Sequence, residues 1–78
     1  MKKEDLLNRI TINPEVMVGK PTIRGLRITV EQILKAIAGG VTVDELLDDY
    51  PELEREDIQA VLVYASELVN KEQVFTVK

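Results

Sequence analysis

The sequence contains no cysteine and no histidine. These absences exclude disulfide bonds, Cys/His zinc sites, thiol nucleophiles and Ser-His-Asp arrangements, so we expect no catalytic residues, no metal site and no cofactor. Tryptophan is missing too, and the aromatic residues are only Tyr50, Tyr64 and Phe75. Any folded core must therefore be aliphatic, and we expect a protein that is not an enzyme.

Long hydrophobic runs are also missing. No apolar stretch approaches the roughly 20 residues that cross a bilayer, and the chain turns polar at Glu4 and Asp5, so we expect a cytoplasmic protein with no membrane partner. With 78 residues, the chain has room for a single domain over residues 1–78. Because so short a chain buries only roughly 60% of its surface on folding, we expect a homodimer.

Charge is distributed unevenly along the chain, whose net charge is -4. Residues 1–30 carry six basic and three acidic side chains, which gives +3, whereas residues 31–78 carry four basic and eleven acidic side chains, which gives -7. A phosphate backbone would be attracted to the first part and repelled by the second.

Short extended segments fill the region from Arg9 to Val30. Apolar residues alternate with others at Ile10–Ile12 and at Val16–Val18, and proline or glycine interrupts them at Pro14, Gly19, Pro21 and Gly25. This pattern predicts a small strand and turn region, because the breaks leave no length for a helix. The segment Lys2–Asn8 fits either a turn of helix or a loose end.

Three amphipathic helices are predicted after this region. The first covers Val30–Ala38 and begins with a capping box of Thr29 and Gln32. The second follows a capping box of Thr42 and Glu45 and stops at Pro51, and the third runs from about Glu54 to about Val69. We therefore expect a mainly α fold, a tri-helical helix-turn-helix core after an N-terminal strand and turn region, with a possible short C-terminal strand at Val74–Val77.

Residues 42–62 fit the helix-turn-helix pattern, in which the exposed start of the second helix approaches base edges in DNA. Arg55 at this position suits guanine, and Gln59 suits adenine. A constrained turn earlier in the chain carries further cations that suit phosphate. The candidate DNA-binding residues are Lys20, Arg24, Arg27, Arg55 and Gln59.

The carboxylates around this helix favour a different interpretation. Glu52, Glu54 and Glu56 would face phosphate at close range, where repulsion at low salt reaches over roughly 10 Å. A three-helix core with a solvated acidic face is therefore an open alternative to a DNA reader. Likewise, Arg24 and Arg27 could form ion pairs with the chain's own carboxylates instead of binding a partner.

Three segments resemble a known prokaryotic family: GKPTIRGLRITVEQIL (residues 19–34), GGVTVDELLDDYPEL (39–53) and EDIQAVLVYASEL (56–68). The family is domain-of-unknown-function family 433 (DUF433), small proteins similar to the DNA-binding part of VapB-type antitoxins. The resemblance implies an antitoxin of a type II toxin–antitoxin system that binds operator DNA as a dimer and a PIN-type ribonuclease toxin. The alternative is a protein-interaction module that keeps the helix-turn-helix shape and no longer binds DNA.

Two positions depart from the family's pattern. Leu26 stands where the family suggests a threonine between glycine and arginine, which removes a hydroxyl from the turn. Glu54 stands where a Ser or Thr helix cap is usual, a change that costs on the order of 1 kcal/mol unless another group replaces the cap. The family's turn falls on Gly19, Pro21, Ile23, Gly25 and Arg27, and its second-helix entry falls on Gly40, Leu46, Tyr50 and Pro51.

Overall fold

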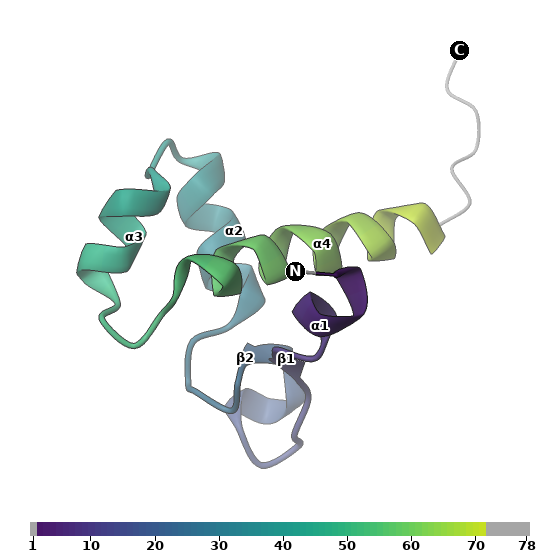
Figure 1. Ribbon diagram of the computed structural model, residues 1–78. Coiled ribbons are helices and arrows are strands. Elements are labelled where there is room, and N and C mark those ends of the chain that lie inside the picture. The colour runs from purple at the N-terminus through teal and green to yellow at the C-terminus, as the bar shows by residue number, and fades with distance from the viewer. Residues whose placement is uncertain (1, 72–78) are drawn as a thin grey trace.

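Helices dominate the structure, a computed structural model that describes residues 2–71 (Figure 1). The mainly α fold predicted from the sequence is confirmed. None of the helices within these residues is both long and apolar enough to cross a membrane. The elements are α1 (Lys3–Leu7), β1 (Ile10–Thr11), a 3-10 turn (Met17–Gly19), β2 (Thr22–Ile23), α2 (Val30–Ala38), α3 (Val43–Asp49) and α4 (Arg55–Lys71).

Both predicted capping boxes are present. The Oγ1 atom of Thr29 accepts the N–H of Gln32 at 3.0 Å, and Oε1 of Gln32 accepts the N–H of Thr29 at 2.9 Å. Thr42 and Glu45 make the same reciprocal pair at 3.1 and 2.8 Å. Each box satisfies backbone donors that a helix start leaves unpaired, so α2 and α3 begin where the sequence predicts.

The structure differs from the sequence-based expectation at several segment ends. The helix α4 continues to Lys71, whereas Lys3–Leu7 adopts the helical one of the two alternatives left open for Lys2–Asn8. The Val16–Val18 segment is not extended, because Met17 and Val18 have left-handed φ angles of +50° and +57° and belong to the 3-10 turn. The possible strand at Val74–Val77 lies outside the described residues.

The N-terminal region is a minimal antiparallel hairpin. Ile10 of β1 lies opposite Ile23 of β2. The chain then reverses through Arg24 and Gly25, whose φ angles are +48° and +74°, and the N–H of Leu26 bonds the carbonyl of Ile23 at 2.8 Å. Two consecutive left-handed residues are the signature of a type I′ turn, in which glycine is favourable and arginine is not.

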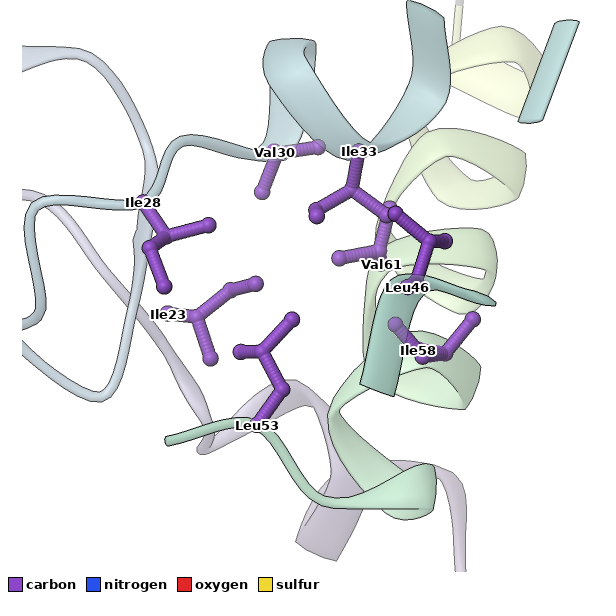
Figure 2. Close-up of a cluster of buried hydrophobic side chains, with 8 residues drawn as sticks. All are labelled: Ile23, Ile28, Val30, Ile33, Leu46, Leu53, Ile58 and Val61. Atoms are coloured by element: carbon purple, nitrogen blue, oxygen red, sulfur yellow. The ribbon is translucent and has the colours of Figure 1, made fainter. Parts of the chain in front are cut away.

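The hydrophobic core joins this hairpin to the helices (Figure 2). Ile23 from β2 is fully buried and lies near Leu53, which comes from the loop before α4. The turn that follows β2 is thereby packed at the start of α4, the part of a helix-turn-helix that meets DNA. The buried residues of the cluster are Ile23, Ile28, Val30, Ile33, Leu46, Leu53, Ile58 and Val61.

Candidate functional site

A buried carboxylate organises the start of α4. Asp57, the third residue of the helix, has a solvent exposure of 0%. Its Oδ2 atom accepts the backbone N–H of Glu54 at 2.8 Å. In a capping box the side chain of the third helical residue accepts the backbone N–H of the cap residue, and Asp57 makes this bond to Glu54. The helix therefore starts without the Ser or Thr hydroxyl that usually makes the other bond of the box.

Two arginines from the N-terminal region bind the same carboxylate. Arg24 is bidentate, with Nε 3.0 Å from Oδ1 and Nη2 2.8 Å from Oδ2 of Asp57. Nη2 also donates to the backbone oxygen of Glu52 at 2.7 Å. Arg9 bridges two acids, with Nη1 3.0 Å from Oδ1 of Asp57 and 2.7 Å from Oε1 of Glu54. We call Arg9, Arg24, Glu54 and Asp57 the Asp57 cluster.

The Asp57 cluster is electrically balanced, with two positive and two negative side chains. Burial by itself raises the pKa of Asp57, but the hydrogen bonds from Arg24, the Glu54 backbone and Arg9 outweigh it, so the pKa lies below its ordinary value. The hydrogen bond to Asp57 raises the pKa of Arg24, and hydrogen bonds to Glu54 and then to Asp57 raise the pKa of Arg9. Asp57, Arg9 and Arg24 are therefore all charged at neutral pH, and each of the two guanidinium groups is paired with a carboxylate.

The five candidate DNA-binding residues have different environments. Arg24 belongs to the Asp57 cluster, as one of the two sequence-based alternatives anticipated. Lys20 pairs with Glu31 at 2.9 Å, and its hydrogen bond lowers the pKa of Glu31. Arg55 pairs with Asp44 at 2.7 Å, but its side chain remains 60% exposed. Arg27 and Gln59 are exposed, and Arg27 makes no ion pair within residues 2–71.

Three of these five residues lie at the same end of the molecule. Arg55 and Gln59 stand about one turn apart at the start of α4. Arg27 is three residues from Arg24, whose side chain contacts Asp57, so the Cα atoms of the two arginines lie within roughly 10 Å of each other. Lys20 lies elsewhere, because its partner Glu31 is in the first turn of α2.

An acidic face borders these residues. It covers α3, the turn that leads to α4 and the first turn of α4, and we define it as Asp44, Glu45, Asp48, Asp49, Glu52 and Glu56, all exposed or partly exposed. Asp44 pairs with Arg55, and Glu45 caps α3. Asp48, Asp49 and Glu52 form no ion pair with any described residue. No metal-binding arrangement of three acidic side chains occurs in the described part of the chain.

The ion pair between Arg9 and Asp57 is not predicted from the sequence, and neither residue is among the candidate site residues. The periodicity of α4 contained the signal for Asp57, because position 57 is four residues before the buried Val61 and so falls on the same helix face. A carboxylate on a buried face needs a cationic partner. The sequence could therefore have predicted that a partner exists, although not that Arg9 and Arg24 supply it.

Comparison with known proteins identifies the family. The sequence model of "Protein of unknown function (DUF433)" matches residues 10–65. This chain belongs to the DUF433 family. The match extends from β1 into α4 and so includes Arg24 and Asp57 of the Asp57 cluster, whereas Arg9 immediately precedes it.

One relative of this DUF433 protein is the uncharacterized protein y4eO of Sinorhizobium fredii (strain NBRC 101917 / NGR234). The two are 32% identical over 56 residues, which make up 72% of this chain and 25% of the relative. The DUF433 chain thus spans about a quarter of that protein's length. No solved structure matches the chain with significant similarity.

Proposed function

We propose that this DUF433 protein is the antitoxin of a prokaryotic type II toxin–antitoxin pair, which binds a PIN-type ribonuclease toxin and, as a dimer, its own operator DNA. The acidic face carries the proposal. A ribonuclease must bind the phosphate backbone of RNA, and such binding depends on Lys and Arg side chains. Asp48, Asp49 and Glu52 offer that cationic surface a complementary row of carboxylates, which favours a specific protein complex.

Operator contacts are assigned to Arg27, Arg55 and Gln59. The ion pair between Arg55 and Asp44 is exposed, and exposed pairs contribute little stability, so Arg55 can exchange Asp44 for guanine or phosphate at small cost. Lys20 is similarly exposed and remains a candidate phosphate contact at a separate place. Arg24 is instead a positioning residue, because withdrawing it would leave the buried carboxylate of Asp57 short of a partner.

The acidic face also determines how strongly DNA is bound. Its carboxylates lie on the helix-turn-helix itself, so they repel the phosphates that Arg27 and Arg55 attract. We expect weak operator binding by the chain alone, with a steep loss of affinity as salt increases. A toxin seated on the acidic face would neutralise the repulsion and strengthen operator binding, and by linkage DNA would strengthen toxin binding equally.

Toxin binding is tested by co-expressing the chain with a PIN-type ribonuclease encoded beside it and measuring the affinity of the purified pair. The Asp48→Asn/Asp49→Asn variant should bind the ribonuclease at least about tenfold more weakly, a loss of roughly 1.4 kcal/mol. Glu4→Gln/Asp5→Asn is the matched control, since it removes two neighbouring exposed carboxylates from α1. Equal binding by both variants would rule out the acidic face as the toxin site.

A protein-interaction module without DNA binding is the second candidate function. The neutralised Arg24 and the net charge of -4 favour it. The deciding measurement is binding of the chain to its own upstream DNA across a salt series from low ionic strength. Binding to that DNA at low salt supports the operator-binding antitoxin. If no DNA is bound at low salt, either with or without the toxin, the interaction module is the better description.

A further inference from the structure

The second half of α4 carries an apolar face that no other part of residues 2–71 covers fully. Leu62, Leu68 and Val69 are 46%, 47% and 58% exposed, unusually high for aliphatic side chains on one helix. Ala65 lies between them at helical spacing and is partly exposed. Figure 1 shows α3 beside the first half of α4 and α1 beside the second half. We call Leu62, Ala65, Leu68 and Val69 the α4 face.

The α4 face is free of charge in a strongly charged molecule. Glu67 is the one charged residue between positions 62 and 69, and it binds Nζ of Lys3 at 3.0 Å, on the side of α4 that packs against α1. The acidic face would bring carboxylates together if two copies met there. The α4 face is where a second copy can approach without that repulsion.

We propose that the α4 face binds the α4 face of a second copy, with the two helices antiparallel and crossing beside Ala65. The order of side-chain sizes along the face supports this occupant. A large residue, Leu62, is followed by small Ala65 and then by large Val69, so an antiparallel copy places Leu62 against the partner's Val69 and brings the two Ala65 residues together. A surface that matches itself in this way is what a two-fold dimer requires.

The proposed dimer also fits the spacing of DNA half-sites, and this step rests on the proposed operator binding. Arg55 precedes the crossing point by about 10.5 residues, or about 16 Å at 1.5 Å per residue. In the dimer the two Arg55 residues therefore stand about 32 Å apart along the helices. Successive major-groove half-sites on one side of DNA are about 34–36 Å apart, so both helix starts can reach DNA together.

The size of the apolar surface sets the expected strength of the dimer. A groove of about 310 Å³ adjoins the α4 face at Leu68, where Leu34 of α2 and Tyr64 extend the apolar area, and the mutually paired Lys20, Glu31 and Lys35 also line it. Stable complexes cover roughly 800 Å² on each partner, more than a few half-exposed side chains provide. We therefore expect a dimer that dissociates on dilution.

Disulfide trapping tests the geometry in the full-length chain, which has no cysteine of its own. Facing Cα atoms of two helices with axes 8–10 Å apart are about 3.4–5.4 Å apart, which overlaps the 4.4–6.8 Å of disulfides. The Ala65→Cys variant should oxidise to a covalent dimer. Asn70→Cys is the control, because position 70 is exposed and about 140° away around the helix. Equal cross-linking of the two variants, or none at position 65, would overturn the proposal.

Sedimentation equilibrium gives an independent test. Leu62→Glu should raise the dimer dissociation constant more than about tenfold, because it buries two unpaired carboxylates at the interface. Val18→Glu makes the same exchange at an exposed aliphatic residue away from α4 and should leave the constant unchanged. A chain that stays monomeric at every concentration contradicts the dimer, whereas a trapped dimer that ignores operator DNA contradicts only the operator function.

Discussion

Arg24 and Asp57 form a bidentate ion pair across 33 residues of sequence, with contacts of 3.0 and 2.8 Å. To reach it, Arg24 adopts a φ angle of +48°, a left-handed conformation that costs a residue with a side chain roughly 1–2 kcal/mol. The ion pair offsets this strain. It fastens the turn at Arg24 and Gly25, and with it the adjoining segment that carries Arg27, to the start of α4, so the guanidinium of Arg24 is occupied by contacts within the chain.

Removing the shared carboxylate should destabilise the whole domain. We expect Asp57→Asn to lower the free energy of unfolding by about 2–4 kcal/mol, because Arg24 loses its anionic partner and Arg9 keeps only Glu54. Urea denaturation measures the change. Asp48→Asn is the control, as Asp48 is exposed and should change stability by less than about 0.5 kcal/mol. Equal effects of the two substitutions would show that the Asp57 cluster contributes no stability.

The Asp57 cluster also predicts acid sensitivity. The pKa of Asp57 is lower in the folded protein than the roughly 3.9 of an unfolded aspartate, so the folded state binds the proton more weakly. Its stabilising contribution is therefore complete above about pH 5 and is lost as pH falls through the folded pKa. The stability difference between the wild type and Asp57→Asn should stay constant from pH 5 to 7 and shrink below pH 4. A difference that grows in acid would contradict the assigned direction.

Local sequence patterns predicted the helices well because capping and amphipathicity act over a few residues. Thr29 and Gln32 fixed the start of α2, and Thr42 and Glu45 fixed that of α3. The patterns predict the end of α4 less well, because no strong stop signal precedes Lys71, and they leave Lys3–Leu7 open between a turn of helix and a loose end. The family resemblance covered the same segments and is confirmed by the match over residues 10–65.

The Asp57 cluster was beyond such patterns because its contacts join distant segments. Arg9 and Asp57 are 48 residues apart, and nothing in local periodicity links them. The left-handed Val18 is a second example, since a β-branched residue disfavours that conformation and the Val16–Val18 alternation predicted extended backbone. The turn that carries Arg24 and Arg27 can be located from the sequence. Whether these arginines face solvent or carboxylates depends on tertiary packing.

The capping box of α3 offers a test of local stability at the helix-turn-helix. Thr42→Ala removes the oxygen that accepts the N–H of Glu45, which should cost about 1 kcal/mol. Thr42→Ser keeps a hydroxyl and should restore most of the loss. Thermal unfolding followed by circular dichroism measures both variants. If serine and alanine lowered the midpoint equally, the methyl group of Thr42 rather than its cap would be the source of stability.

Arg24 and Arg27 give the sharpest separation of structure from function. Arg24→Ala should lower the free energy of unfolding by about 1–2 kcal/mol, a value reduced from that of a fully buried pair because the Arg24 side chain is 36% exposed. Arg27→Ala should leave stability within about 0.5 kcal/mol of the wild type. It should instead weaken binding to operator DNA and reduce the salt slope of that binding by about 1, the signature of one lost phosphate contact.

Both variants are compared at a temperature where each is fully folded. If Arg24→Ala then reduced DNA affinity and its salt slope while Arg27→Ala changed neither, the assigned roles of the two arginines would be reversed.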